Sequence, residues 1–186
     1  MTRDRKRVLA EYLVIAAQSG DRVAFARLAR LWQPDFLRHA ARLLGEAEPS
    51  RDAVQDAWLD IVRGLPRLRE PVAFPAWAFR IVTRKCTGLI RSRQIVRATA
   101  SALTNEPHAT SVDGAGLAEQ AADVGHIREA MADLPDDQRL ALALHYQDGL
   151  TLAEISVVTD VPLGTVKTRL MHARRKLADQ LSPDRN

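Results

Sequence analysis

Cysteine and long apolar runs are scarce in this 186-residue sequence. Cys86 is the single cysteine, which excludes an internal disulfide and fits a reducing compartment. We interpret it as a small core residue. No apolar run approaches the ~20 residues of a membrane-spanning helix, and the basic N-terminus is not followed by a signal-peptide pattern. We therefore expect a cytoplasmic protein without direct membrane insertion.

The residue patterns that carry catalysis or metal binding are also missing from the sequence. There is no glycine-rich phosphate loop, no acid–base pair on one helical face and no Cys/His cluster with metal-ligand spacing. We therefore predict no catalytic residues, no metal, no cofactor and no small-molecule substrate, and we do not expect an enzyme. Aromatic residues are 5% of the chain, so its cores should consist mainly of Leu, Ala, Val and Ile.

Charge is present but unevenly distributed. The formal net charge is +4. Residues 80–97 contain six basic and no acidic residues, whereas residues 106–160 contain eleven acidic and two basic residues. Segregated charge of this kind favours local nucleic-acid surfaces over a uniformly basic protein.

Apolar residues recur at helical spacing along most of the chain, which predicts an all-α fold. We expect helices at residues 8–17, after a cap at Asp21, from a start or kink at Pro34 to Gly45, and after a cap at Ser50. Residues 99–123 are rich in small and polar residues and read as a flexible linker. The predicted organisation is a helical bundle at 8–96, a linker at 97–123 and a second small helical domain at 124–184.

Residues 148–177 have the pattern of two helices joined by a tight turn. Gly149 suits the left-handed end of a preceding helix, and Thr151 and Glu154 have capping-box spacing. A turn follows at residues 159–161, and Pro162 suits the first turn of the next helix. The pattern predicts a helix-turn-helix.

The second helix of this motif has a narrow apolar stripe and a cationic opposite side. The stripe consists of Val166, Leu170, Ala173 and Leu177. Residues 162–177 contain five basic and no acidic residues. A solvated basic helix would share this pattern, but the turn and caps favour a helix in the DNA major groove. The residues expected to contact DNA are Gly164, Thr165, Lys167, Thr168, Arg169, His172, Arg174, Arg175 and Lys176.

The helix over residues 52–63 shows a polar face that contains one leucine. That face consists of Asp52, Gln55, Asp56, Leu59, Asp60 and Arg63. An apolar side chain among acidic and amide groups is compatible with a protein-docking patch. By the residues alone, however, a solvated helix face explains the pattern better.

Residues 66–93 combine a proline-bracketed loop with an amphipathic helix. The loop carries Arg67 and Arg69. The polar arc of the helix contains Arg80, Thr83, Arg84, Thr87 and Arg91, with Trp77 at its edge. A cationic stripe beside an aromatic ring suits single-stranded nucleic acid, but Trp77 fits a packed core equally well. Gly88 costs the helix about 1 kcal/mol, so we expect this segment to be ordered only in a complex.

Taken together, these motifs resemble the extracytoplasmic-function (ECF, group IV) sigma factors of bacterial RNA polymerase. The region 4 likeness comprises Leu134-Pro135, Gln138-Arg139, residues 146–155, Gly164–Leu170 and Ala173-Arg174. The region 2 likeness comprises Asp52–Trp58, Phe74, Trp77, Arg80-Ile81 and Arg91. Together, the two likenesses cover nearly the whole chain except the linker and termini.

The resemblance implies an alternative sigma factor that binds core RNA polymerase and directs promoter recognition and melting. The Asp52–Arg63 face would dock on the polymerase clamp helices. The Pro66–Pro71 loop and the Trp77–Arg93 helix would bind and open the −10 element of promoter DNA. The Pro162–Lys176 helix would read the −35 element, and an anti-sigma factor is implied as a further partner.

Some residues depart from the family pattern. Thr168 stands where serine is usual, and His172 where arginine is usual. Arg84 replaces a frequent asparagine and Gly88 a frequent aspartate beside the −10-facing side. The changes at Arg84 and Gly88 predict an altered sequence preference at the −10 element.

Two alternatives stay open at this point. A stand-alone helix-turn-helix regulator would use residues 1–96 for dimerisation or sensing, but it needs neither the 52–63 face nor the 80–91 stripe. An all-α interaction module without DNA binding would show no salt-dependent DNA affinity.

Overall fold

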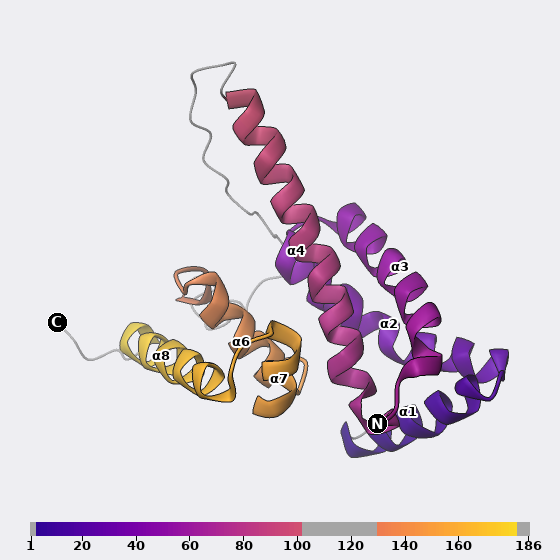
Figure 1. Ribbon diagram of the computed structural model, residues 1–186. Helices are drawn as coiled ribbons and strands as arrows, with labels where there is room; N and C mark the ends of the chain where they lie inside the picture. Colours follow the sequence, from indigo (N-terminus) through magenta and orange to yellow (C-terminus); the bar gives the residue numbers. More distant parts are fainter. Residues whose placement is uncertain (1–2, 102–129, 182–186) are drawn as a thin grey trace, which may run out of the picture. The chain divides into compact units, whose positions relative to one another are not determined.

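The computed structural model describes residues 3–101 and 130–181, and in those residues all regular structure is helical (Figure 1). The chain divides into two compact units, residues 1–113 and 114–186. This confirms the predicted all-α class with two helical domains. The last helix of the first unit ends at Ser101, beyond the expected boundary at residue 96, and the remainder of the predicted linker lies outside the described residues.

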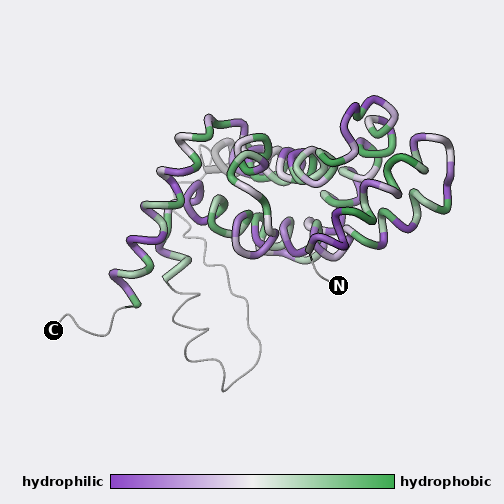
Figure 2. Tube along the Cα trace, turned by 90° about the horizontal axis from the view of Figure 1, so that it is seen from below, coloured by the Kyte–Doolittle hydropathy of each residue, from purple (hydrophilic) through white to green (hydrophobic). Residues whose placement is uncertain are grey.

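The first unit is a helical bundle. Its elements are α1 (Arg3–Gln18), α2 (Arg22–Leu44), α3 (Ala47–Gly64), the short 3₁₀ turns η1 (Leu65–Arg67) and η2 (Pro71–Ala73), and α4 (Phe74–Ser101). Helix α2 packs against α1, α3 and α4, and α3 packs along α4. Hydrophobic and hydrophilic residues alternate along these helices, as expected for amphipathic helices with one buried face (Figure 2).

Aromatic side chains from α2 and α4 form the centre of this bundle. The rings of Phe36 and Phe79 meet edge to face with centroids 5.2 Å apart, and Trp32 contacts both rings. All three side chains are buried. Edge-to-face packing of this kind is worth about 0.5–1.5 kcal/mol per pair beyond simple burial, so it fixes the inner face of α4.

Helix α2 is continuous through Pro34, so the alternative that a separate helix begins there is wrong. Pro34 lies inside the helix and is exposed. Buried side chains continue on the inner face on both sides of it, at Leu28, Trp32, Phe36 and Ala40. Their i, i+4 spacing shows one packed stripe, which outweighs the hydrogen bond that proline removes.

The predicted cap at Ser50 is also wrong. Helix α3 begins three residues earlier, at Ala47, and its N-cap is Glu46. Ser50 is buried inside the helix and donates its hydroxyl to the carbonyl oxygen of Glu46. Pro49 lies in the first turn, where its missing N–H is tolerated, so the proline did not mark the boundary. The cap predicted at Asp21 is confirmed, because its carboxylate accepts from the Val23 and Ala24 amides.

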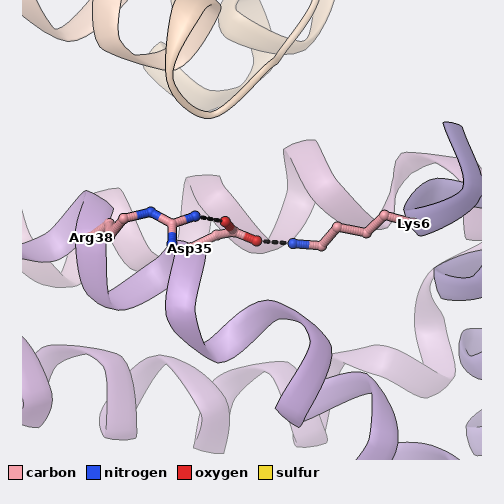
Figure 3. Close-up of polar contacts among 3 residues, drawn as sticks. All are labelled: Lys6, Asp35 and Arg38. Atoms are coloured by element: carbon pink, nitrogen blue, oxygen red, sulfur yellow. Dashed lines mark hydrogen bonds and ion pairs between the residues drawn. The ribbon is translucent and has the colours of Figure 1, made fainter. Parts of the chain in front are cut away.

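A charged cluster joins α1 to α2. The carboxylate of Asp35 accepts from both Lys6 and Arg38 (Figure 3). The Lys6 ammonium also lies 4.2 Å from the centroid of the Trp32 ring, within the range of a cation–π contact. Asp35 and Lys6 are mostly buried, so this cluster contributes to holding the two helices together.

The second unit contains a short helical stretch at residues 130–132 and three helices: α6 (Asp136–Tyr146), α7 (Leu152–Thr159) and α8 (Leu163–Leu181). Each of the three packs against the other two. Leu144, Leu150, Ile155 and Leu170 are buried in their centre. Gly149 has a φ of 75°, which confirms the left-handed position expected before α7.

Two kinds of site are absent from the described ranges, 3–101 and 130–181. No helix in them is long and apolar enough to cross a membrane. No group of three His, Cys, Asp or Glu side chains in the same residues is arranged to hold a metal ion.

Candidate DNA-binding and protein-docking surfaces

Helices α7 and α8 form the predicted helix-turn-helix. The capping box is complete, because the Glu154 amide donates to Thr151 Oγ1 at 3.2 Å and the Thr151 amide donates to Glu154 Oε2 at 2.7 Å. Asp160 ends α7 in the left-handed conformation with φ 58°. The Ser156 hydroxyl donates to the Val161 carbonyl at 2.6 Å. The turn is therefore held by its own polar groups.

Helix α8 buries three residues of the predicted apolar stripe, leaves the fourth, Leu177, half-buried, and exposes most of the predicted DNA-facing side. Val166, Leu170 and Ala173 are buried. Exposed residues of the opposite side are Gly164, Thr165, Lys167, Thr168, Arg174, Arg175 and Lys176, and His172 is half-buried. A β-carbon on Gly164 would meet nothing within 4 Å. Packing inside the chain therefore does not require glycine at this position.

Two arginines of the predicted set are tied to α6. Arg169 Nε lies 2.9 Å from Asp137 Oδ2, and its side chain is 24% exposed. Arg174 Nε donates to the Tyr146 hydroxyl at 2.8 Å, and its guanidinium lies 5.5 Å from the ring centroid. These contacts restrict both side chains, so Arg169 and Arg174 orient α8 on α6 in the free chain.

One exposed side chain of the same face, that of Met171, was not among the predicted residues. Met171 is 55% exposed and follows Gly164 by seven residues, which is close to two helical turns. It therefore lies between Gly164 and Arg175 on the front of α8. Its spacing from Gly164 was the signal that would have found it.

Helix α4 presents a row of cationic and polar side chains along one side. Arg80, Arg84, Thr87 and Arg91 follow one another at i, i+4, i+7 and i+11. Arg84, Thr87 and Arg91 are exposed and Arg80 is half-buried. Among the described residues, no ion pair is found for Arg84 or Arg91. The helix continues through Gly88 in the free chain, contrary to the expectation that a complex would be needed to order it.

Thr83 does not belong to this row, and its placement on the polar surface is corrected. Its side chain is buried, and its hydroxyl donates to the Phe79 carbonyl at 2.8 Å. His39 Nε2 lies 2.8 Å from the same oxygen. Because the hydroxyl proton is already used, the imidazole acts as the donor. Thr83 therefore joins α4 to α2, and His39 is a structural residue.

Trp77 stands at the start of the row, against the end of α3. Its ring is half-buried and lies 6.1 Å from the Phe74 ring, centroid to centroid. A β-carbon on Gly64 would lie 2.7 Å from Cζ2 of this ring. Trp77 thus packs on the backbone of α3 and keeps part of its ring accessible. Arg67 and Arg69, on the preceding loop, are exposed.

Other basic residues of α4 are paired within the bundle. Lys85 Nζ lies 2.8 Å from Asp60 Oδ2, and Arg93 Nη1 donates to Glu46 Oε1 at 2.7 Å. These pairs join α4 to both ends of α3. They also leave the row beginning at Arg80 as the cationic side of α4 that faces away from α3.

Cys86 lies on the inner side of α4. Its side chain is fully buried, and burial raises the pKa of its thiol to about 12. The thiol is therefore protonated near neutral pH and is a poor nucleophile, which agrees with its interpretation as a core residue.

The polar face of α3 is on the surface, as predicted. Asp52, Gln55, Asp56, Leu59 and Arg63 are exposed, and Asp60 is partly covered. Leu59 and Val62 are each 50% exposed and lie almost one turn apart. Val62 was not predicted, although its i+3 spacing from Leu59 would have indicated it. The face therefore has two apolar side chains flanked by carboxylates.

Comparisons with known families match both units. Residues 28–95 match the model for Sigma-70 region 2, and residues 126–177 match the model for Sigma-70, region 4. A helical bundle followed by a helix-turn-helix, each matched to its own sigma-70 region, is the organisation of a sigma factor.

Similarity to two relatives shows which family of sigma factors the chain belongs to. The chain is 30% identical to the RNA polymerase sigma-H factor of Pseudomonas aeruginosa over 183 residues, covering 93% of this chain and 94% of the relative. It is 32% identical to the ECF RNA polymerase sigma factor SigM of Mycobacterium tuberculosis over 169 residues, covering 89% and 81%. The chain therefore belongs to the ECF family of RNA polymerase sigma factors. It is an alternative sigma factor that acts in transcription initiation.

A solved structure shows the same fold. The sigma factor RpoE, in its complex with the anti-sigma factor NepR from Bartonella quintana, superposes with a TM-score of 0.68 at 22% identity, covering 87% of this chain and 98% of that one. Matches over both units leave no separate role for a sensing domain, so the alternative of a stand-alone regulator is set aside.

Proposed function

We propose that the two units of this sigma factor divide promoter recognition between them. The first unit, predicted at residues 8–96, contacts core RNA polymerase and the −10 element. The second, predicted at 124–184, contacts the −35 element. The observation that carries the proposal is that each unit has its own outward cationic surface on a helix whose back is buried.

In the second unit, α8 is proposed to lie in the major groove at the −35 element. The middle of the exposed side of α8 carries small residues, Gly164, Thr165 and Thr168. Exposed cations lie beside them, at Lys167, Arg175 and Lys176. Small front residues allow close approach to base edges, and the cations bind phosphates. Arg169 and Arg174 act mainly by orienting α8. His172, half-buried beside Thr168, contributes at the edge of the surface.

In the first unit, the row of Arg80, Arg84, Thr87 and Arg91 is proposed to bind the backbone of the opened −10 element. Trp77 at its end offers an aromatic ring for an unpaired base, and Arg67 and Arg69 on the loop add phosphate contacts. Because Thr83 and the aromatic core fix α4 to α2, the row is held in position before DNA arrives.

The face of α3 is proposed to dock on the clamp helices of core polymerase. Leu59 and Val62 supply apolar contact area, and Asp52, Gln55, Asp56, Asp60 and Arg63 supply a polar rim. A small apolar centre with a charged rim is the composition of a non-obligate protein interface. Asp60 is held by Lys85, so it also anchors α3 to α4.

The remaining partners and setting follow from the family. We propose group IV membership, action in the cytoplasm where core polymerase and promoter DNA are found, and a binding role without catalysis. An anti-sigma factor is proposed as a partner, because the similar RpoE structure holds NepR.

The test is transcription in vitro with purified core polymerase and a library of promoter DNA. Specific start sites are expected only when this chain is added. Leu59→Asp should abolish them at limiting protein while leaving DNA binding by α8 intact. Val23→Asp is the matched control, since Val23 is also an exposed aliphatic side chain, but on α2. Initiation by the Leu59 variant equal to that of the parent would contradict the docking assignment.

A further inference from the structure

An apolar groove lies between α1 and α2, outside the surfaces assigned above. It has a volume of about 420 Å³ and is lined by Leu9, Tyr12, Leu13, Arg27, Arg30 and Leu31. Tyr12 is 67% exposed and Leu9 39% exposed. Val8 and Ile15, on the outer side of α1, are also more than half exposed. A 16-residue helix with four exposed large apolar side chains has an unpartnered face.

The wall of the groove formed by α2 is cationic. Arg27 and Arg30 are exposed, and among the described residues neither has an ion pair. Arg5 lies one turn before Leu9 on the same side of α1 and is likewise exposed and unpaired in those residues. The acidic residues of α1, Asp4 and Glu11, lie on the far side of Val8. Three arginines therefore border the groove.

The shape and charge together indicate the occupant. A groove between two helices accepts the apolar stripe of a third helix, with anchor side chains at i, i+3 or i+4, and i+7. Unpaired arginines along one wall favour carboxylates on the matching edge of that helix. We propose that the α1–α2 groove binds an amphipathic α-helix of a partner protein, with leucine-type residues in the groove and Asp or Glu facing Arg27 and Arg30.

Two other occupants fit less well. An anionic membrane would bind a convex apolar face that inserts between lipids, whereas this surface is a pocket among whose lining residues Leu13 is buried and Leu31 is half-buried. A second copy of the chain would place arginines of one groove near those of the other about a two-fold axis, and like charges there repel. The proposal does not depend on promoter recognition, because none of these residues belongs to the surfaces described above.

The test uses the full chain and a synthetic helical peptide of about 18 residues, long enough to hold a helix when stapled. The peptide has leucines on one stripe and glutamates along one edge, and a second peptide has lysine at each glutamate position. Binding is measured by fluorescence anisotropy. The expected result is micromolar affinity for the glutamate peptide and at least tenfold weaker affinity for the lysine peptide.

Charge reversal provides the decisive comparison. The R27E/R30E variant is expected to bind the glutamate peptide at least tenfold more weakly than the parent does and to bind the lysine peptide more tightly. R22E is the matched control, because Arg22 is exposed on the same helix but lies about 140° from Arg27 at 3.6 residues per turn. Equal affinity for both peptides, no effect of R27E/R30E, preferential binding to anionic vesicles, or dimerisation that Tyr12→Ser abolishes would each overturn the proposal. In vitro transcription by the same variants shows separately whether sigma activity is intact.

Discussion

Gly64 and Trp77 are packed so closely that a β-carbon at residue 64 would lie 2.7 Å from Cζ2 of the indole. Gly64 has φ −90° and ψ −25°, which alanine adopts readily. The requirement for glycine at this position is therefore steric. The contact joins the end of the proposed docking helix α3 to the proposed stacking residue on α4.

Gly64→Ala should accordingly displace the Trp77 ring. We expect promoter opening to fall at least tenfold, with the helical content of the protein preserved. Potassium permanganate footprinting of unpaired thymines measures the opening, and circular dichroism checks the fold. Trp77→Ala serves as the reference for complete loss of the ring. Normal opening by Gly64→Ala would show that Trp77 has no stacking role or that its ring moves without consequence.

Thr83 gives a second prediction, because it is buried where a surface position was expected. Thr83→Val keeps the shape of the side chain but removes the hydroxyl that bonds His39 and the Phe79 carbonyl. The buried His39 N–H then loses the Thr83 oxygen as its acceptor, and the loss of such an acceptor lowers the unfolding free energy by about 1–3 kcal/mol. Urea denaturation should show this loss of unfolding free energy. Unchanged stability combined with impaired promoter opening would return Thr83 to the DNA-facing surface.

Thr83 and Pro34 are positions at which prediction from the sequence alone failed. Helical spacing correctly separated the inner face of α4 from the row of Arg80, Arg84 and Arg91, but Thr83 lies at the border between the two. Its side chain turns inward because His39 on α2 offers a polar partner there, and that pairing across 44 residues leaves no local signal. Pro34 similarly predicts a break that packing on both sides overrides.

The helix-turn-helix was predicted more completely, for a physical reason. Its capping box, its turn and its apolar stripe all depend on residues within one or two helical turns, so local spacing determines them. The ion pair between Arg169 and Asp137 joins positions 32 residues apart and was not foreseen. The sequence does not distinguish an exposed arginine from one that forms an ion pair with a residue far away in the chain.

Gly164 allows a test of whether α8 approaches DNA closely. Because a β-carbon there meets no atom within 4 Å and alanine is the better helix former, Gly164→Ala should not lower the unfolding free energy. If the front of α8 lies against base edges, the same methyl group should weaken binding to a −35 duplex several-fold. Electrophoretic mobility shift assays at fixed salt measure the affinity. Unchanged affinity would place Gly164 away from the DNA.

Cys86 should be unreactive in the folded protein. Burial raises the pKa of its thiol from its ordinary value of 9.0 to about 12, so a thiol reagent at pH 8 should modify it only on unfolding. The sign of the pH dependence follows: the thiol contributes stability below about pH 9 that is lost as the pH rises toward 12, because the unfolded state releases the proton first. Rapid stoichiometric modification of the native protein would contradict this burial.

The proposed role of α4 in promoter opening is tested most directly by comparing initiation from a duplex promoter with initiation from the same promoter carrying a pre-opened −10 bubble. The variant with Arg80, Arg84 and Arg91 replaced by alanine is assayed with core polymerase on both templates. Replacing Arg22, Arg27 and Arg30 on α2 removes the same charge and serves as the control. We predict at least a tenfold loss of initiation by the α4 variant on the duplex, a smaller loss on the bubble, and near-parental activity of the control. Equal activity of the α4 variant and the parent on the duplex, or equal losses in both variants, would contradict the assignment of α4 to promoter opening.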